Sequence, residues 1–378
     1  MLTLPAFRAD PRIRLVAAAA PRADSRDAFV RDFGGTAHDT VTALAADPNV
    51  EAIYVATPHQ MHADHVVAAL DGGKHVLVDK PLSVSLEDAD RMVAAARRAG
   101  RHLIVGPSHS FDEPVALARR MIESGEYGAL RMVQAFNYTD FLYRPRRPEE
   151  LRTEEGGGVL FSQGVHQIDI VRLLCGGQAE RLFAMTGAWD PERPTEGAYT
   201  ALLSFAGGAF ATLTYSGMAH FDSDIWMDNI GELGAPKDAG GYGAARRALR
   251  GLDPAAEAQL KTTRTFGQGK MLAPATAHEH FGPVIALCDR ADLRLTPTGV
   301  EVFGDTERRF VPAPLRGPRR EVTDALVTAV RRDSAPAQTG AWGLASLEVC
   351  HAILASARTG APVTLTRQCG INEQEHAR

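Results

Sequence analysis

VEAIYVATPHQMHADHVVAALDGGKHVLVDKP, residues 50–81, contains two short apolar runs separated by a helical pattern. Residues 50–56 and 75–78 have the length of strands and are apolar almost throughout, whereas residues 62–70 form a helical pattern that ends at Gly72-Gly73. Strands that are buried on both faces appear as unbroken apolar runs, and a helix between two of them is typical of a parallel pair. This stretch therefore predicts a strand–helix–strand unit of a parallel sheet.

The same alternation extends in both directions along the first third of the chain. Upstream, we predict a strand at 13–20, a helix at 24–33 and a short helix at 40–46. Downstream, Ser85 begins a capping box with Asp88, and the helix that follows runs to Gly100 before a strand at 102–105. The sequence thus predicts an α/β dinucleotide-binding domain with a Rossmann-like parallel sheet over residues 1–107.

The remainder of the chain has strands that follow one another. We predict helices at 113–124, about 161–174, 319–332 and 343–358, and strands at 129–138, 181–188, 199–206, 209–216, 224–230, 293–296 and 300–303. Residues 234–275 are rich in glycine, alanine and arginine, and we interpret them as an irregular insertion with one helix. Consecutive strands indicate a mostly antiparallel open sheet, so residues 108–378 form an α+β domain for substrate binding and oligomerisation.

Composition and charge exclude several classes of protein. The chain has 378 residues, 41 lysines and arginines, 46 aspartates and glutamates, and a formal net charge of −5. A mildly acidic chain is a poor non-specific ligand for nucleic acid, and the first apolar run, at 15–20, is too short to span a membrane. The four cysteines form no CxxC pair, so we expect reduced thiols in a cytoplasmic protein that binds neither nucleic acid nor membrane.

One group of candidate residues lies where predicted strands end. Lys80 follows the strand at 75–78, Thr57 and Pro58 follow the strand at 50–56, and His62 opens the next helix. Ligands bind at the carboxyl ends of the strands in open parallel sheets. These residues therefore predict a binding crevice; the alternative is that Lys80 is a solvated loop lysine.

A second group follows the glycine run at 156–158. On a helix, Ser162, His166 and Asp169 share one polar face, because they are four and three residues apart. A histidine beside a carboxylate is a suitable proton-transfer group near neutral pH. The alternative is a surface histidine that is merely paired with Asp169.

Three further patterns carry weaker predictions. Histidines recur at positions 59, 62 and 65, and again at 278 and 280, but nothing indicates that they converge, so we predict no metal site. Arginines at 144, 146 and 147 precede the glycine run and suit a carboxylate ligand, unless they form a solvated basic loop. Residues 108–112, SHSFD, lie at the domain junction and form either substrate contacts or a turn.

Several separated motifs resemble the glucose–fructose oxidoreductase, inositol dehydrogenase and MocA (Gfo/Idh/MocA) family. They are ATP at 56–58, GKHVLVDKPL at 73–82, the glycine run followed by His166 and Asp169, and glycines at 340 and 343 with Ser356-Ala357. The resemblance covers residues 5–366 and implies an NAD- or NADP-dependent dehydrogenase. It implies Lys80 and His166 as catalytic residues, and it places Thr57, Pro58, His62, Asp79 and Lys80 at the cofactor.

The chain departs from the family pattern in three respects. The family opens with a strand and a Gly-x-Gly-x-x-Gly loop, and this chain has neither, so we expect an incomplete N-terminus. Ala20 stands where an acidic residue would bind the ribose of NAD, and nearby Arg22 favours NADP or a relaxed preference. Ser162, followed by Gln163, replaces the usual catalytic aspartate.

Residues 137–148 and 162–167 are similar to the family's phthalate cis-dihydrodiol dehydrogenase branch. That similarity implies a cyclic dihydrodiol dicarboxylate as substrate, bound by Arg144, Arg147, Ser162, Gln163 and Asp169. The alternatives are a sugar or inositol dehydrogenase and a non-catalytic relative that has lost the glycine loop. The resemblance also implies a homo-oligomer, either a dimer or a tetramer.

Overall fold

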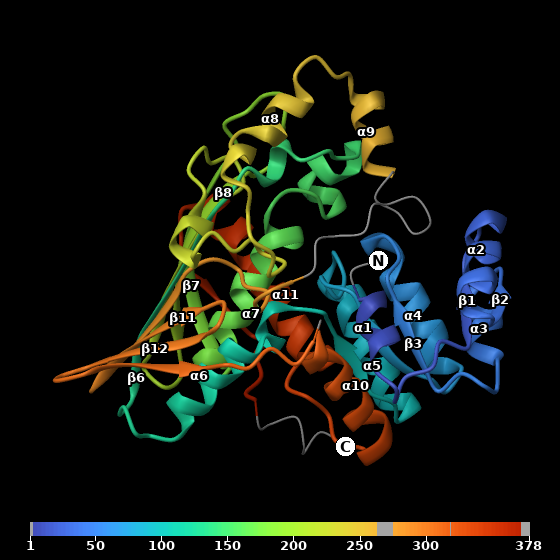
Figure 1. Ribbon diagram of the computed structural model, residues 1–378, viewed down its shortest axis with the longest axis horizontal. Helices are drawn as coiled ribbons and strands as arrows, with labels where there is room; N and C mark the ends of the chain where they lie inside the picture. Colours follow the sequence, from blue (N-terminus) through green and yellow to red (C-terminus); the bar gives the residue numbers. More distant parts are fainter. Residues whose placement is uncertain (1–2, 263–274, 318, 372–378) are drawn as a thin grey trace.

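The computed structural model describes residues 3–262, 275–317 and 319–371 (Figure 1). Its strands form three sheets: β1-β2, β3-β4-β5, and a nine-stranded sheet in the order β13-β12-β11-β10-β6-β9-β8-β7-β14. The two small sheets belong to the first third of the chain, and the large sheet belongs to the remainder. The α/β prediction of a parallel region followed by a mostly antiparallel region is confirmed.

The three-stranded sheet consists of β3 (Ala52–Val55), β4 (His75–Val78) and β5 (Leu103–Val105), all parallel. Alternate residues of each strand point to opposite faces. Val76 and Val78 pack in the main core with α4 (His62–Asp71) and α5 (Leu86–Ala99), whereas Leu77 packs with α1 (Leu4–Ala9) and α10 (Arg320–Arg332). Helix α10 lies far along the chain, so the parallel sheet is covered in part by the C-terminal region.

The other parallel pair is β1 (Ala17–Ala19) with β2 (Thr36–His38), next to α2 (Ala23–Phe33) and α3 (Val41–Ala46). The predicted strand at 13–20 is therefore shorter than expected, and the polar β2 was not predicted. Within the described residues, no strand pairs with the outer edge of β1 or of β3, so the parallel strands form two sheets. Figure 1 shows β1 and β2 set apart from β3.

The large sheet contains β6 (Leu130–Tyr138), β7 (Ala179–Gly187), β8 (Ala198–Phe205), β9 (Phe210–Ser216), β10 (Val284–Cys288), β11 (Ala291–Thr296), β12 (Gly299–Gly304), β13 (Arg308–Pro312) and β14 (Val363–Thr364). Only the β6–β9 pair is parallel. One face of the sheet is buried under α6 (Glu113–Glu123), α7 (Val165–Leu174) and α11 (Gly340–Thr359).

Some predicted elements in this region were wrong. The predicted strand at 224–230 is instead a short 3-10 helix, η7 (Ser223–Met227). The Asp222 side chain accepts a hydrogen bond from the Asp224 N–H and so caps the first turn of this helix. Strands β10, β13 and β14 were missed. The insertion holds a second helix: α8 (Ala244–Leu249) and α9 (Pro254–Thr262) are both present, together with η8 (Ala239–Gly241). Residues 263–274 of the predicted insertion lie outside the described residues.

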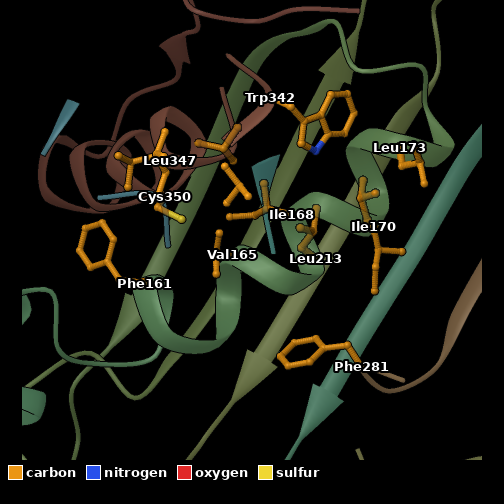
Figure 2. Packing of buried hydrophobic residues seen from close by; sticks show 14 of the residues in the cluster. Phe161, Val165, Ile168, Ile170, Leu173, Leu213, Phe281, Trp342, Leu347 and Cys350 are labelled. Carbon is orange, nitrogen blue, oxygen red and sulfur yellow. The ribbon is translucent and has the colours of Figure 1, made fainter. Parts of the chain in front are cut away.

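Figure 2 shows α7 between the large sheet and α11, with Val165 and Ile168 among the surrounding apolar side chains. Among the described helices, α11 alone has the length and apolar composition of a membrane span. About 72% of the apolar stretch of α11 is buried inside the protein, as in the core helix of a globular fold. Helix α7 is thus packed on both sides, and its first turn carries His166, one of the two predicted catalytic residues.

Candidate active site

A cavity of about 650 Å³ lies between the parallel sheets and the segment before α7. Its lining comes from the end of β1, the exit of β3, the arginine-rich segment and the glycine run. Five of the predicted site residues line it: Arg22, Thr57, Pro58, Arg147 and Ser162. The structure therefore brings the two predicted motifs together across one opening.

His62 takes a position behind this cavity. Its side chain is buried, and its two ring nitrogens lie 3.0 Å from the carbonyl oxygen of Pro81 and 2.9 Å from that of Thr57. The ring thereby connects the segments that follow β3 and β4. His62 does not line the cavity, whereas the neighbouring His59 does.

Lys80 extends from the end of β4 toward α7. Its Nζ donates a hydrogen bond of 2.6 Å to the carbonyl oxygen of Ser162. Burial lowers the pKa of Lys80, and the negative charges of Asp79 and Glu232 oppose that shift. Asp79 accepts hydrogen bonds from the Lys80 backbone and from the Tyr54 hydroxyl, so it supports Lys80 from behind without lining the cavity.

Ser162 lies in η6 (Leu160–Gly164), a π-helical turn that leads into α7. Its hydroxyl donates a hydrogen bond to the carbonyl oxygen of Gly158. The Gln163 side-chain amide donates a hydrogen bond of 3.1 Å to the Ser162 carbonyl oxygen. Single π-helical turns inside helices occur frequently at functional sites. Here the turn directs the Ser162 carbonyl oxygen toward both Lys80 and Gln163.

His166 is a buried residue with 6% of its surface exposed. Burial and the positive charge of Lys80 lower its pKa well below the ordinary value, so the ring is neutral at neutral pH. Its Nδ1 atom is buried and has no hydrogen-bond partner among the residues that the structure describes. The ring lies against His109, with ring centres 4.5 Å apart, and against Phe281, with ring centres 5.3 Å apart.

The predicted pairing of His166 with Asp169 does not occur. Asp169 is buried and accepts hydrogen bonds from the Ser108 hydroxyl, at 2.5 Å, and from the Trp342 indole. The helical spacing places the two residues on neighbouring turns, but the Asp169 carboxylate binds Trp342 of α11 and Ser108 of the segment after β5 instead of His166. The alternative of a surface histidine is excluded as well, because His166 is buried.

Sequence reasoning did not identify the closest charged neighbours of His166. His109, in η2 (His109–Phe111), has its Nδ1 2.7 Å from an oxygen of Asp112 and its Nε2 3.8 Å from an oxygen of Glu232. Burial opposes a charge on His109, but the two carboxylates raise its pKa above the ordinary value. Burial would raise the pKa of Glu232, whereas His109, Arg144 and Lys80 together lower it to about 2.

The segment at 108–112 was noted as a possible source of substrate contacts, and this was the one available signal for His109. Nothing local in the sequence indicates Glu232, which lies in a turn closed by the bridge between Ile230 and Pro236. Its place beside His109 is a result of tertiary folding.

The three neighbouring arginines have different environments. Arg144 approaches Glu232, with 3.9 Å between the charged groups, and Asp140, at 3.6 Å. Arg146 is buried over the ring of Phe141. Arg147 lines the cavity and is paired with Glu149 and Glu150. Of the three, Arg144 lies beside Glu232 and so faces the histidine cluster, by which we mean His109, His166 and Glu232, whereas both Arg146 and Arg147 line the cavity.

The other histidine patterns are held by protein partners. His65 Nδ1 lies 3.0 Å from the Thr57 hydroxyl, His278 Nε2 lies 3.0 Å from the Ala313 carbonyl oxygen, and His280 Nε2 lies 2.9 Å from the Ile230 carbonyl oxygen. Among the described residues, two groups have the spacing of possible metal ligands. One is His109, His166 and Glu232, and the other is His109, Asp112 and Glu279.

Two family models match most of the first two thirds of the chain. The model described as "Oxidoreductase family, NAD-binding Rossmann fold" matches residues 2–107, and the model described as "GFO/IDH/MocA C-terminal domain" matches residues 115–235. The chain belongs to the Gfo/Idh/MocA oxidoreductase family. The resemblance seen in its motifs is confirmed.

Relatives extend this result over nearly the full length. The 1-carboxy-3-chloro-3,4-dihydroxycyclohexa-1,5-diene dehydrogenase of Comamonas testosteroni is 43% identical over 361 residues, which cover 94% of this chain and 91% of the relative. The crystal structure described as "the putative dehydrogenase from Bordetella bronchiseptica RB50" is 41% identical, with a TM-score of 0.91 and 96% coverage of both chains. A levoglucosan dehydrogenase in complex with NADH and levoglucosan is 18% identical, covers 96% of this chain and 94% of its own, and has a TM-score of 0.71, so it shows a shared fold.

The cavity residues fit a dinucleotide. Small side chains at 19, 20 and 56 and the glycine run leave space, and Arg22 and Arg147 supply positive charge for phosphates. Within the described residues, no glycine-rich turn at a helix N-terminus lines the cavity.

Proposed function

We propose that this protein is an NAD(P)-dependent dehydrogenase that oxidises a cyclic secondary alcohol, specifically a cis-dihydrodiol that carries ring carboxylates. The main support is the convergence of Lys80 with the first turn of α7. The Lys80 Nζ donates to the carbonyl oxygen of Ser162 in η6, and His166 lies four residues later, in the first turn of α7. A cation and a neutral imidazole are thus close together beside the cavity.

These two groups suit removal of a proton from a hydroxyl. The Lys80 ammonium binds the hydroxyl oxygen and stabilises the negative charge that develops there, and neutral His166 accepts the proton. Bound in the adjoining cavity, the nicotinamide ring would supply the hydride acceptor for the carbinol carbon. The C–O single bond becomes a carbonyl, and the resulting cyclic hydroxyketone rearranges to an aromatic diol.

The substrate class rests on a relative and on Arg144. The Comamonas relative acts, by its name, on a carboxylated dihydroxycyclohexadiene. An arginine fork binds a carboxylate through two hydrogen bonds, and Arg144 lies next to the histidine cluster. Both observations favour a dihydrodiol carboxylate over an uncharged sugar or inositol.

Replacement of Lys80 tests the catalytic proposal. Lys80→Ala should lower kcat by on the order of 10²–10⁴-fold, because the hydroxyl loses its cation. The assay follows reduced nicotinamide at saturating cofactor and dihydrodiol, and circular dichroism checks the fold. Lys74→Ala is the matched control, since Lys74 binds the Asp47 carbonyl oxygen far along the sequence from α7. Equal turnover of the two variants would refute the assignment of Lys80.

We further propose that the cofactor preference leans toward NADP. Arg22 occupies the N-cap position of α2 without a capping side-chain hydrogen bond, and it lines the cavity near Ala20, a position without an acidic side chain. An arginine there accommodates the 2′-phosphate, whereas an acidic residue would bind the two ribose hydroxyls. Intrinsic fluorescence titrations should give a lower Kd for NADP than for NAD, and Arg22→Ser should remove most of the difference. Tighter binding of NAD by the unaltered protein would contradict this preference.

We also propose that copies of the chain associate through the outer face of the large sheet. That face bears exposed apolar side chains on adjacent strands, including Phe183 on β7 and Leu202 on β8, which are direct partners in the register. Contiguous apolar patches on a folded protein commonly mark an interface.

A further inference from the structure

Glu232 is the carboxylate of the histidine cluster, and it has no part in the proton transfer to His166. It lies in the turn closed by the bridge between Ile230 and Pro236, far from α7 in the sequence. One of its oxygens lies within 4.8 Å of a ring nitrogen of His166 and of one of His109. We propose that Glu232 binds the second hydroxyl of the diol, on the carbon next to the one that is oxidised. This inference rests on the proposed oxidation of a cis-dihydrodiol.

Glu232 differs from the other carboxylates near the two histidines in its free capacity to accept hydrogen bonds. Three neighbouring carboxylates each have a protein partner within 3.2 Å, namely Asp112, Asp169 and Glu279. The charged groups closest to the Glu232 carboxylate are His109 Nε2 at 3.8 Å and Arg144 Nη1 at 3.9 Å. Both distances exceed the roughly 2.7–3.2 Å of an N–H···O hydrogen bond. A ligand hydroxyl can therefore donate to Glu232 without displacing a protein donor.

The Glu232 side chain is also open to a ligand. It is 26% exposed, whereas the His109 side chain is 4% exposed. Burial would raise the pKa of Glu232, but the positive groups His109, Arg144 and Lys80 lower it to about 2, so the carboxylate is ionised at neutral pH. An ionised carboxylate accepts hydrogen bonds and donates none. Glu232 is thus suited to a hydroxyl donor.

A cis-diol has the shape to contact both His166 and Glu232. Its two hydroxyls project from adjacent carbons to the same side of the ring, so their oxygens are close neighbours. The hydroxyl that is oxidised lies at Lys80 and gives its proton to His166, as in the proposed reaction. The second hydroxyl then lies beside the first and can donate a hydrogen bond of about 2.7–2.8 Å to Glu232, whose carboxylate is within 4.8 Å of the His166 ring nitrogen.

The negative charge of Glu232 should also orient the substrate. A ring carboxylate at the place of the second hydroxyl would be repelled by Glu232, whereas Arg144 attracts it. The alternative is that Glu232 only balances the positive charges of His109 and Arg144. That role would not depend on the number of hydroxyls in the ligand, so a comparison of ligands separates the two.

The test is isothermal titration of the full chain, in excess NADP, with 3,4-dihydroxybenzoate, 3-hydroxybenzoate and 4-hydroxybenzoate. The first compound has two adjacent hydroxyls and a carboxylate, and each of the others lacks one hydroxyl. The unaltered protein should bind the dihydroxy compound roughly 10-fold or more tightly than either monohydroxy compound, because a hydrogen bond to a charged acceptor is gained.

Glu232→Gln should remove most of this preference for two hydroxyls. The monohydroxy compounds should bind to the variant at least as tightly as to the unaltered protein, because a negative charge near their carboxylate is lost; this binding also shows that the variant is folded. Glu126→Gln is the matched control and should keep the preference, since Glu126 is 59% exposed and paired with Arg309.

The inference is overturned if the unaltered protein binds all three compounds equally, or if Glu232→Gln changes the three Kd values by the same factor. The second result is the one expected for charge balance alone. Since the titration requires no turnover, its result is distinct from a failure of the proposed function. That failure would appear as an absence of dihydrodiol oxidation by the unaltered protein.

Discussion

At the scale of single residues, Lys80 and Arg144 differ in how far the sequence alone identifies them as site residues. Lys80 is recognisable from its place after an apolar strand, and the structure places its ammonium at the Ser162 carbonyl oxygen. Arg144 is recognisable only as one of three neighbouring arginines. The structure separates them, because Arg144 faces Glu232 whereas Arg147 lines the cavity beside Glu149 and Glu150.

Arg144 should therefore determine affinity for a carboxylated substrate. Arg144→Gln should raise KM for a dihydrodiol carboxylate by on the order of 10–100-fold, since a charged hydrogen bond contributes about 1.5–3 kcal/mol. The measurement is initial rate against substrate concentration, with a dihydrodiol that lacks carboxylates as the comparison substrate. That comparison substrate should respond little to the change.

Arg147→Gln is the matched control for this experiment. Because Arg147 faces the cavity and not the histidine cluster, its replacement should change the cofactor KM more than the substrate KM. If Arg144→Gln leaves the KM of the carboxylated diol unchanged, a sugar or inositol dehydrogenase becomes the better proposal, since such substrates have no carboxylate.

At the scale of elements, the segment that enters α7 holds the site together. Gly158 has a φ of 76°, and a Cβ there would overlap the carboxylate of Glu196. That carboxylate accepts a hydrogen bond of 3.1 Å from the backbone of Leu160, the first residue of η6. The glycine run therefore allows Glu196 to anchor the turn that carries Ser162.

Gly158→Ala should destabilise the protein more than an ordinary glycine replacement at positive φ. The left-handed backbone costs about 1–2 kcal/mol for an alanine, and displacement of the buried Glu196 should add about 1–3 kcal/mol. The measurement is the free energy of unfolding in urea. Gly100→Ala is the control, because Gly100 has a φ of 59° but open space around its Cα. Equal losses in both variants would show that Glu196 does not anchor the turn.

At the scale of the whole molecule, the large sheet has two very different faces. One face is buried under α6, α7 and α11, whereas the other carries Phe183, Met185, Leu202 and Phe210, each at least 41% exposed. Alternation along β7, β8 and β9 places these side chains together on the outer face. Water contact with so much adjacent apolar surface is unfavourable, so a second copy of the chain is the proposed cover.

The unaltered chain should sediment as a dimer or tetramer. A Met185→Glu and Leu202→Glu double variant should shift toward monomer, because a stable interface excludes unpaired charges from its centre. Val30→Glu is the control, since Val30 is similarly exposed but lies on α2. A monomeric unaltered chain in analytical ultracentrifugation would contradict the proposed association.

The sequence alone determined the alternation of parallel strands and helices, the position of Lys80 at a strand end and the family. These features are local, because strand and helix periodicity and the residues after a strand are written in neighbouring positions. For the same reason, the polar β2 and β13 escaped prediction, as did the 3-10 helix η7, whereas β10 was missed although residues 284–288 form a short apolar run.

Only the tertiary structure decided which side chains meet. It placed Lys80 at Ser162, which is 82 positions away, gave Asp169 to Ser108 and Trp342, and set His109 beside Glu232. Such contacts depend on how sheets and helices pack over the whole chain, and a hydrogen bond forms only where that packing brings a donor within about 3 Å of an acceptor. Spacing on one helix could suggest a partner for His166, but it could not exclude the stronger partners that other elements offered to Asp169.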